Sequence, residues 1–499
     1  MLNSEKSSNA SPTRVIVDVM NSLKKYTESS LARIVMKFLL RRDKKTKKTY
    51  IEYFLARARG EEMRFPMIVR LISPIFNHYL QKLSSALDVD YNHFLEVLEP
   101  PWTKKVIASI MKGFAYFGVR RPFTPGAPFL VVWDFTYRCN LRCKHCYSSA
   151  GVLRPEMTVE ERLKALDILA EAGVAMLALS GGEPILGPGF WEVLKAANDY
   201  GMYLAMATNG TLITDEVARK LAQAGLRYAQ VSLDSPIPEV HDEFRGVKGA
   251  WEKTVKGIRN LKKYGITVEV AMTVTKLNYR QVPQMVKFVR DELKADMFMM
   301  FNLVPTGRGK EIINLDLTPK ERKEVLEYLA NELYRGFHSA STAPQYAFVS
   351  YEIGNKVGRQ IITGHFYGIE TQMYGPRFLA LLEFLGGCGA GRMYCALEPN
   401  GDIQPCVFMP IKVGNILKDD FEELWRTNKV FEELRNRELL KGECANCQYK
   451  YICGGCRARA YAYFGDYLAP DPGCIFAMES WQRVLKEILG SEKTRGYSS

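Results

Sequence analysis

The chain has 499 residues, of which 47% are hydrophobic and 25% charged, a composition typical of folded globular proteins and not of collagen-like or disordered chains. This length suffices for about three domains with full-sized hydrophobic cores. No uncharged apolar run reaches the ~18 residues that a membrane-spanning helix needs, and the first twenty residues lack the apolar core of a signal peptide, so we expect a cytoplasmic protein.

The formal net charge of +13 is concentrated near the start of the chain. Residues 1–121 hold 22 Lys and Arg against 11 Asp and Glu, whereas residues 122–499 hold 46 against 44. Apolar residues between 13 and 112 recur at steps of three and four, which is typical of helices, and a basic run at 41–48 interrupts them. We therefore predict a basic helical N-terminal region over residues 1–120.

Three interpretations of this basic region stay open. It is a solvated helical cap with a charged loop, or a peripheral anchor that contacts an anionic membrane surface through residues 14–60, or a nucleic-acid-binding segment. We rank nucleic acid last, because a basic patch without a recognisable groove-reading motif is weak evidence for it.

After a linker rich in Pro and Gly at 121–128, short β-rich runs alternate with helical patterns. The predicted strands are 129–135, 174–180, 204–208, 228–234, 267–274 and 297–304, and the predicted helices between them are 158–172, 189–200, 214–224, 248–264 and 280–292. Largely apolar strands joined by helices indicate a parallel α/β sheet with a covered outer face. The pattern fits a doubly wound sheet and a partial barrel equally well.

The remaining chain divides by its cysteine content. Residues 318–336 are predicted to be a helix within a connector or insertion over 311–385, whose later part has no strong periodicity. A cysteine-rich segment follows over 386–480, and a C-terminal helix and tail over 481–499. Eleven cysteines, an odd number, in a chain without secretion signals argue for metal or redox chemistry and against a disulfide framework.

The first cysteine group follows the first predicted strand directly. Cys139, Cys143 and Cys146 are spaced Cys-x3-Cys-x2-Cys on one short loop, where parallel α/β folds place their active sites. Three thiolates can hold three corners of an iron–sulfur cubane and leave the fourth iron open, as a catalytic metal requires. A zinc site with His145 or a distant residue as its fourth ligand is the alternative.

This motif, with His145 before its last cysteine, resembles that of the radical SAM superfamily. The resemblance covers residues 125–310 and implies a partial (β/α)6 TIM-like barrel. It also implies a [4Fe–4S] cluster on Cys139, Cys143 and Cys146, whose open iron binds S-adenosyl-L-methionine. The cluster then cleaves this cosubstrate reductively to methionine and a 5′-deoxyadenosyl radical. An external one-electron donor of the ferredoxin or flavodoxin type is expected as a partner.

Polar motifs at the ends of the later strands match the same family in order. They are the run Ser180 to Pro184 (Ser-Gly-Gly-Glu-Pro), Thr208-Asn209-Gly210, Ser232-x-Asp234, Thr273 with Thr275, and the run 305–309 (Pro-Thr-Gly-Arg-Gly). The resemblance implies that the contacts to S-adenosylmethionine come from His145, Tyr147, Gly181, Gly182, Glu183, Asn209, Ser232, Asp234 and Thr273. No residue can be assigned a catalytic role beyond binding.

The other eight cysteines resemble the SPASM domain that extends many radical SAM enzymes. The resemblance implies two auxiliary [4Fe–4S] clusters, the first on Cys388, Cys395, Cys406 and Cys456 and the second on Cys444, Cys447, Cys453 and Cys474. Two residues separate Cys453 from Cys456 where three are usual, and the Cys395–Cys406 spacing is short. Both departures leave open whether the chain holds one or two auxiliary clusters, because the first is fully ligated, or absent, or incompletely ligated and open to substrate. Structural zinc at Cys444, Cys447, Cys453 and Cys456 is the alternative.

The run from Cys453 to Tyr461 (Cys-Gly-Gly-Cys-Arg-Ala-Arg-Ala-Tyr) and the run 305–309 resemble the branch that makes haem by the alternative pathway and haem d1. That resemblance implies hydrogen abstraction from a tetrapyrrole side chain, with auxiliary clusters that take up an electron or orient the substrate. Modification of a peptide or a lipid is the alternative within the family. A zinc-bearing binding protein without catalysis is the alternative outside it.

Overall fold

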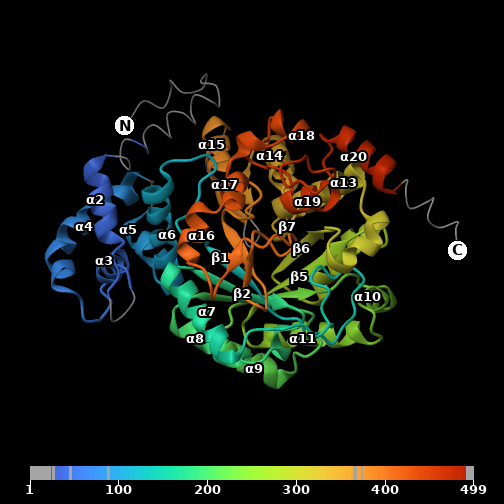
Figure 1. The fold of residues 1–499 in the computed structure, drawn as a ribbon, viewed down its shortest axis with the longest axis horizontal. Coiled ribbons are helices and arrows are strands. Elements are labelled where there is room, and N and C mark those ends of the chain that lie inside the picture. Colours follow the sequence, from blue (N-terminus) through green and yellow to red (C-terminus); the bar gives the residue numbers. More distant parts are fainter. Residues whose placement is uncertain are drawn as a thin grey trace.

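A mixed sheet of ten strands forms the centre of the structure, a computed structural model that describes residues 24, 29–43, 48–86, 90–363, 368–371 and 375–489 (Figure 1). The strand order is β12-β11-β10-β1-β2-β3-β4-β5-β6-β7. Its strands are β1 (Leu130–Thr136), β2 (Met176–Gly181), β3 (Tyr203–Thr208), β4 (Tyr228–Ser232), β5 (Thr267–Val274), β6 (Met297–Asn302), β7 (Ser339–Ser341), β10 (Tyr394–Leu397), β11 (Asp402–Gln404) and β12 (Gly414–Asn415).

Strands β1 to β6 pair in parallel in sequence order, which is the arrangement of a partial (β/α)6 barrel. Alternate side chains face opposite sides of each strand. On β1, Val131 and Trp133 join the large core beneath the helices, whereas Leu130 and Val132 join a smaller apolar cluster on the other face. Asp134 continues the second series, so it faces the barrel interior at the carboxyl end of the strand.

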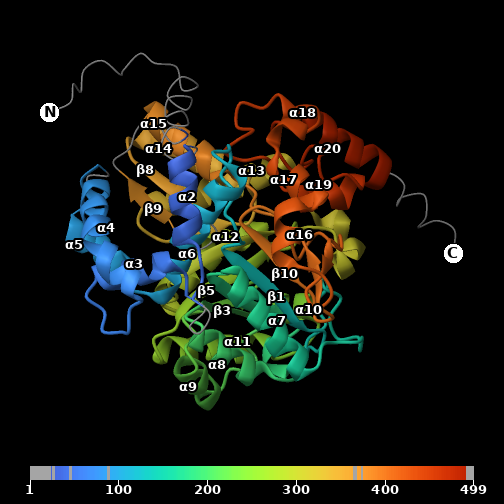
Figure 2. The same cartoon turned by 60° about the vertical axis from the view of Figure 1, so that its left-hand side comes forward.

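The connecting helices cover the outer face of these strands (Figures 1 and 2). They are α7 (Val159–Ala172), α8 (Phe190–Asp199), α9 (Asp215–Gln223), α10 (Pro238–Arg245), α11 (Ala250–Lys263) and α12 (Val282–Lys287). Local sequence sets their ends: α7 begins at a capping box of Thr158 and Glu161 and ends at Gly173, whose φ of 93° favours glycine. The pattern of the sequence did not predict α10.

The stretch predicted as a connector contains regular structure. After α13 (Pro319–Tyr334), β7 extends the sheet by parallel pairing with β6. The helix α14 (Gln345–Val357), the hairpin β8 (Gln360–Thr363) with β9 (Gly368–Thr371), and α15 (Gly375–Leu385) follow. A strand of only three residues, Ser-Ala-Ser, carries no apolar alternation, which is why the sequence pattern missed it.

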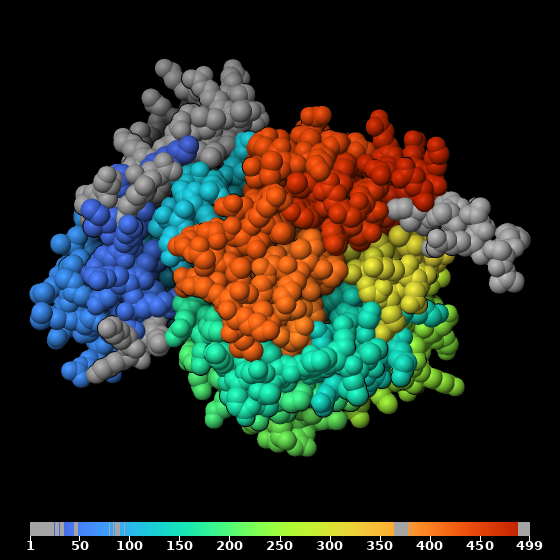
Figure 3. Space-filling view, in the orientation of Figure 1, coloured from blue at the N-terminus to red at the C-terminus, as the bar shows by residue number. Residues whose placement is uncertain are grey.

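The cysteine-rich C-terminal segment is built onto the same sheet. Strand β10 pairs in parallel with β1, and β11 and β12 continue the sheet in antiparallel fashion. Short helices follow: α16 (Phe421–Thr427), α17 (Lys429–Arg435), α18 (Gly442–Ala445), α19 (Arg457–Phe464) and α20 (Met478–Val484). Figure 3 shows this segment, orange to red, lying over the barrel and against the N-terminal helices in blue.

The N-terminal region is helical where it is described, with α2 (Ser30–Leu39), α3 (Tyr50–Ala58), α4 (Met67–Ala86), α5 (Tyr91–Val97) and α6 (Pro101–Phe117). These helices share an apolar cluster of their own around Phe54 and Val69. Of the predicted membrane contact at 14–60, residues 14–23, 25–28 and 44–47 lie outside the described residues. Among the described helices, none is both long and apolar enough to cross a bilayer.

Candidate functional site

Three cysteines from the loop after β1 lie together at the carboxyl end of the barrel. Cys139, Cys143 and Cys146 share one small cluster with Leu141 and Ala250. Backbone N–H groups point at two of the thiols, from Leu141 to Cys139 Sγ and from Ala150 to Cys146 Sγ, each at 3.4 Å. Burial raises the pKa of Cys139 to about 11, so a bound cation is needed to keep this thiol ionised.

A buried guanidinium, that of Arg245, lies beside the remaining thiol of the loop, that of Cys143. Arg245, the last residue of α10, donates from Nη1 to Cys143 Sγ at 3.6 Å and from Nε to Asp234 Oδ2 at 2.6 Å. The other carboxylate oxygen of Asp234 accepts the backbone N–H of Thr273 at 2.9 Å. Asp234 is fully buried and occupied by protein partners, so here it positions Arg245 against the cysteine loop. Its predicted contact with S-adenosylmethionine stays a prediction.

His145, on the cysteine loop, packs against α10. Its ring stacks on Phe244 with 4.3 Å between centroids, and its Nε2 lies 3.9 Å from Asp234. Burial lowers the pKa of His145 to about 3, so the imidazole is neutral. This neutral ring supports the loop from one side and has an Nδ1 without a hydrogen-bond partner among the described residues.

The two glycines after β2 allow that strand to approach the cysteine loop closely. A Cβ on Gly182 would lie 2.0 Å from the carbonyl oxygen of Arg138, and one on Gly181 would lie 2.8 Å from that of Thr136. The backbone N–H groups of Gly182 and Glu183 donate to these same two carbonyls at 2.8 Å. Only glycine fits this contact, which fixes the start of the loop.

Glu183 and Asn209 connect neighbouring strand ends to the loop. The buried carboxylate of Glu183 accepts from Thr208 Oγ1 at 2.8 Å and from the backbone N–H of Asn209 at 2.9 Å. Burial raises the pKa of Glu183 to about 7. Asn209 then donates from Nδ2 to Asn140 Oδ1 at 2.9 Å, next to Cys139. The structure thus brings these predicted residues to the cysteine loop through the protein's own hydrogen bonds.

Tyr147 and Asp134 meet in the barrel interior. The Tyr147 hydroxyl donates to Asp134 Oδ1 at 2.8 Å and lies 3.1 Å from Ser180 Oγ. Asp134 is 1% exposed, and its Oδ2 has no partner among the described residues. Burial, assisted by the nearby Glu398, raises the pKa of Asp134 well above its usual value. Sequence reasoning did not single out Asp134, although an acidic residue inside an apolar strand was a visible signal.

The ends of β4, β5 and β6 complete the rim of the barrel. Ser232 and Thr273 are half-buried at the carboxyl ends of β4 and β5. After β6, Arg308 donates from Nε to the Cys143 carbonyl at 3.0 Å and from Nη1 to that of Ala150 at 2.7 Å. A Cβ on Gly307 would lie 2.2 Å from the Tyr147 carbonyl. The run 305–309 therefore clamps the cysteine loop.

A second group of thiols gathers around the Tyr394 ring. Cys388, Cys406 and Cys456 share one cluster, and the Tyr394 hydroxyl donates to Cys406 Sγ at 3.1 Å. Burial, with a smaller contribution from the nearby Cys388, raises the pKa of Cys406 to about 12. The ring of Phe408, in the same cluster, lies 4.8 Å from the Tyr147 ring. The second group of thiols therefore lies next to Tyr147, at the end of the barrel that carries the first group of thiols.

Cys395, the fourth predicted ligand of that group, faces the opposite side of β10. It is 1% exposed and belongs to the large core, whereas its neighbour Tyr394 faces the other three cysteines. Burial raises the pKa of Cys395 to about 12, and the charged group near it is Arg435. Because successive side chains of a strand point to opposite faces, the structure separates Cys395 from its predicted partners.

The third group contains the four cysteines predicted for the second auxiliary cluster. Burial and the thiols of Cys474 and Cys444 raise the pKa of Cys453, and Cys444 and Cys447 both contribute to the raised pKa of the buried Cys474. The backbone N–H of Tyr449 points at Cys447 Sγ at 3.4 Å, and that of Gly455 at Cys453 Sγ at 3.3 Å. The structure therefore brings all four together.

The donors of these groups fit iron–sulfur clusters. Each group offers buried or half-buried thiols with backbone N–H groups directed at sulfur, and the first and third groups add a guanidinium, which is how proteins stabilise thiolate-bound clusters. Over the described part of the chain, no three His, Cys, Asp or Glu side chains are close enough to ligate one metal ion.

Comparisons with known proteins agree with this arrangement. Residues 133–289 match the sequence profile of the Radical SAM superfamily, and residues 388–448 match that of an iron–sulfur cluster-binding domain named SPASM. The chain is 37% identical over 355 residues to an AdoMet-dependent heme synthase of Methanosarcina barkeri, which covers 70% of this chain and 97% of that protein.

Other relatives carry different names. The chain is 33% identical to a pre-heme d1 synthase of Dinoroseobacter shibae (69% of this chain, 85% of that protein). It is 30% identical to the mycofactocin maturase MftC of Mycolicibacterium smegmatis (71% and 84%). Among solved structures, Streptococcus suis SuiB bound to its precursor peptide SuiA superposes with a TM-score of 0.61 at 18% identity, covering 86% of this chain and 93% of that one.

Proposed function

The chain belongs to the radical SAM superfamily and carries a SPASM domain, and from this premise we propose that it modifies the side chains of an iron tetrapyrrole. The observation that carries the substrate is the similarity to an AdoMet-dependent heme synthase along 97% of that protein's length. A similar identity to a pre-heme d1 synthase supports the same class of substrate.

The bound cluster and S-adenosylmethionine supply the means to abstract a hydrogen atom from an unactivated C–H bond. The chain's own residues hold this chemistry in place. Arg245 and the backbone N–H groups stabilise the thiolates of the loop, and Arg308 clamps the loop to the end of β6. Asp134 and Tyr147 present a hydrogen-bonded pair to the barrel interior, where a substrate meets the cosubstrate.

The residues on the loop after Tyr147 favour a substrate that is flat and apolar and carries carboxylates. Val152 is 59% exposed and Leu153 is 87% exposed, which is unusual for neighbouring apolar side chains. Arg154 follows them, and its guanidinium lies 3.6 Å above the Tyr137 ring. An apolar pair with an adjacent arginine suits a macrocycle with propionate groups, because guanidinium binds carboxylate bidentately.

The thiol groups of the C-terminal segment are proposed to take part in the reaction. The Phe408 ring of the second group contacts Tyr147, so this group borders the place proposed for the substrate. We propose that it takes up the electron left on the substrate or orients the substrate, which gives a net oxidation. An external ferredoxin- or flavodoxin-type protein is proposed to deliver the electron that starts each cycle.

Isotope transfer tests the substrate. The anaerobic holoenzyme is incubated with reductant, S-adenosylmethionine and an iron tetrapyrrole deuterated on its propionate side chains. We expect deuterium in the 5′-deoxyadenosine, measured by mass spectrometry. Formation of 5′-deoxyadenosine without deuterium contradicts the tetrapyrrole while leaving the radical SAM chemistry intact.

A peptide is the second candidate substrate. The similarity to the mycofactocin maturase MftC, and a fold shared with SuiB in complex with a precursor peptide, favour it. The same assay distinguishes the peptide from the tetrapyrrole. If the peptide is the substrate, a deuterated peptide labels 5′-deoxyadenosine and a deuterated tetrapyrrole does not. A lipid substrate belongs to the same test with a deuterated acyl chain.

We further propose that the N-terminal helices contact an anionic membrane surface, through α4 in addition to the predicted 14–60. Met67, Leu71 and Ile75 form a stripe on α4 and are 69%, 67% and 60% exposed. The helix carries Arg70 and Lys82 on its exposed side and contains no acidic residue. Exposed apolar side chains among cations are typical of helices that lie on anionic lipid.

A further inference from the structure

The second and third groups of thiols are in direct contact through the backbone. The turn from Cys453 to Cys456 joins them, because Cys453 belongs to the third group and Cys456 to the second. The backbone N–H of Cys388, also of the second group, donates to the Cys453 carbonyl at 3.1 Å. A Cβ on Gly387 would overlap the same carbonyl, so only glycine fits there. A charge placed at this turn therefore lies close to both groups.

An arginine guanidinium packs against each of the two glycines of the turn. A Cβ on Gly454, whose φ is 68°, would lie 2.6 Å from Arg437 Cζ. One on Gly455 would overlap the guanidinium of Arg457, which also donates to Cys444 Sγ at 3.8 Å. The two-residue spacing between the cysteines therefore leaves room for two cations beside the turn.

Arg437 has no carboxylate partner in the part of the chain that the structure describes. It is 1% exposed, and its Nη2 donates to the Cys388 carbonyl at 2.7 Å. Its Nε has no hydrogen-bond partner among the same residues. Burial lowers the pKa of Arg437, and the thiols of Cys388, Cys453 and Cys444 act in the opposite direction. Sulfur atoms of both groups are thus the source of negative charge near this guanidinium.

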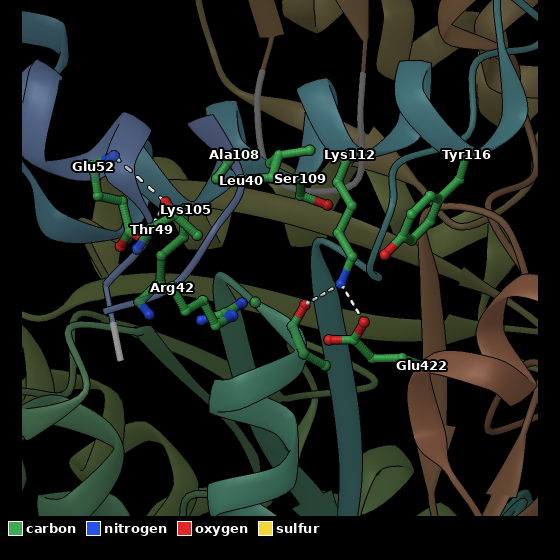
Figure 4. A pocket seen from close by; sticks show the side chains of 12 residues that line it. Leu40, Arg42, Thr49, Glu52, Lys105, Ala108, Ser109, Lys112, Tyr116 and Glu422 are labelled. Carbon is green, nitrogen blue, oxygen red and sulfur yellow. Dashed lines mark hydrogen bonds and ion pairs between the residues drawn. The ribbon is translucent and has the colours of Figure 1, made fainter. Parts of the chain in front are cut away.

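Arg245 and Lys112 show the ordinary arrangement, in which a buried or half-buried cation has a carboxylate partner. Arg245 pairs with Asp234 at 2.6 Å. Lys112, on α6, pairs with Glu422 at 2.7 Å, where the N-terminal helices meet the start of α16 (Figure 4). Burying a guanidinium without such a partner is costly unless another anion lies beside it. Arg437 therefore calls for an anion.

A second buried guanidinium adds to the positive charge near Cys388. Arg392 is also 1% exposed, and its Nη1 donates to the Phe123 carbonyl at 2.7 Å. Burial and the neighbouring Arg437 lower the pKa of Arg392 to about 9, whereas Cys388 acts in the opposite direction. An iron–sulfur cluster with its thiolate ligands is an anion. A cluster at the second group thus supplies the negative charge that these two arginines need.

We propose that Arg437 is a positioning residue shared by the two auxiliary clusters, and that it stabilises the reduced, more negative form of both. Its place between the Cys388 carbonyl and the Gly454 turn supports this, because one guanidinium there faces thiols of each group. A charge that acts on both clusters favours an electron on either. This suits transfer from the second group, beside Tyr147, to the third. The inference rests on the proposed cluster ligands and is independent of the substrate.

Redox titration followed by electron paramagnetic resonance tests the role of this charge. The titration uses the anaerobic full chain carrying Cys139→Ala, so that the signals come from the auxiliary clusters. Arg437→Gln should shift the reduction equilibrium of both clusters about tenfold toward the oxidised form, which is ~59 mV for a one-electron step. The control Arg483→Gln changes an exposed arginine on α20 and should leave both potentials unchanged.

Arg437→Lys separates the charge from the packing. Lysine keeps the positive charge without the planar fork, so its potentials should stay closer to the wild type than those of Arg437→Gln. Loss of auxiliary iron in Arg437→Gln with retention in Arg437→Lys also supports the proposal, because the charge then holds the clusters. Equal shifts in the two variants, loss of iron in both, a shift in only one cluster, or unchanged potentials in Arg437→Gln overturn it. The isotope test of the substrate can fail without changing any of these results.

Discussion

The Arg245 guanidinium lies 3.6 Å from Cys143 Sγ and is held there by Asp234 at 2.6 Å. Burial raises the pKa of Cys143, and Arg245 counteracts this by favouring the thiolate. Replacing Arg245 with Gln removes the positive charge that stabilises the reduced, more negative cluster. We expect its midpoint potential to fall by ~60 mV, a factor of ten for a one-electron step.

A redox titration followed by electron paramagnetic resonance measures that potential. Arg259→Gln, an exposed arginine on α11, is the control and should leave it unchanged. Asp234→Asn loosens the arginine, so it should shift the potential in the same direction by less. An unchanged potential in Arg245→Gln with full iron content would show that the guanidinium does not act on the cluster.

Cysteines of the first and third groups should affect different steps. Cys139→Ala removes a ligand of the cluster that cleaves S-adenosylmethionine, so 5′-deoxyadenosine formation should be abolished and about four irons lost per chain. Cys447→Ala should also lose iron but retain more of the cleavage than of product formation. Iron analysis and chromatography of both products measure the difference. Equal loss of both activities in Cys447→Ala speaks against a separate role for the third group.

Cys395 should be dispensable for iron binding, in contrast to Cys406. The Cys395 side chain lies in the large core on the far side of β10, whereas Cys406 lies beside Tyr394 and two further thiols. We expect Cys395→Ala to keep the wild-type iron content and Cys406→Ala to lose iron. Mössbauer spectra of the two variants decide this. A loss of about four irons in Cys395→Ala would show that Cys395 is a cluster ligand.

Glu269 should make stability depend on pH. Its buried carboxyl accepts from Tyr228 Oη at 2.6 Å and from Gln230 Nε2 at 2.5 Å, and burial raises its pKa to about 7 from a reference of 4.5. The folded state therefore favours the protonated form. The stabilisation from this group is complete below pH ~4.5 and is lost as pH rises to 7, by up to ~3 kcal/mol.

Thermal unfolding at pH 5 and pH 8 measures this effect. Glu269→Gln mimics the neutral carboxyl, so its melting temperature should exceed that of the wild type at pH 8, with a smaller difference at pH 5. Glu252→Gln, an exposed glutamate on α11, should show no such trend. A difference that is the same at both pH values means that Glu269 does not titrate in this range.

The apolar stripe of α4 should govern membrane binding. We expect the wild type to sediment with phosphatidylglycerol vesicles at low salt and not with phosphatidylcholine, because each Lys or Arg near an anionic surface contributes ~1 kcal/mol. Leu71→Asp should abolish sedimentation, since it places a charge in the stripe. Leu485→Asp changes a leucine that is 46% exposed at the C-terminal end and should have no effect. If the wild type stays in solution at low salt, the proposal of a membrane contact is wrong.

Periodicity predicted the strands and helices of the parallel α/β region well, because its strands are apolar and its helices carry clear start and stop residues. The choice of a barrel over a doubly wound sheet came from the family resemblance. Five predicted helices between 158 and 292 correspond to α7, α8, α9, α11 and α12. The helix α10 was missed, and with it Arg245, which lies 102 residues from Cys143 in sequence. Spacing alone does not reveal a contact over that distance.

The roles of individual site residues were less predictable than their positions. The Gly-Gly-Glu run and Asp234 lie at the predicted strand ends, yet here they hold the loop and Arg245. Eight cysteines suggested two sets of four, but the alternation of β10 places Cys395 away from its set. The number of cysteines does not reveal the face of a strand on which each cysteine lies.

The parallel pairing of β10 with β1 also constrains the order of folding during synthesis. Leu130 pairs with Tyr394, so the outer edge of the first barrel strand has its partner 264 residues later in the chain. At the ~5–20 residues per second of translation, this edge stays open for roughly 13 to 50 seconds on the ribosome. An open strand edge is a template for wrong pairing. The outer edge of β1 is therefore a site for wrong pairing in the nascent barrel until the cysteine-rich segment has emerged and β10 has paired with it.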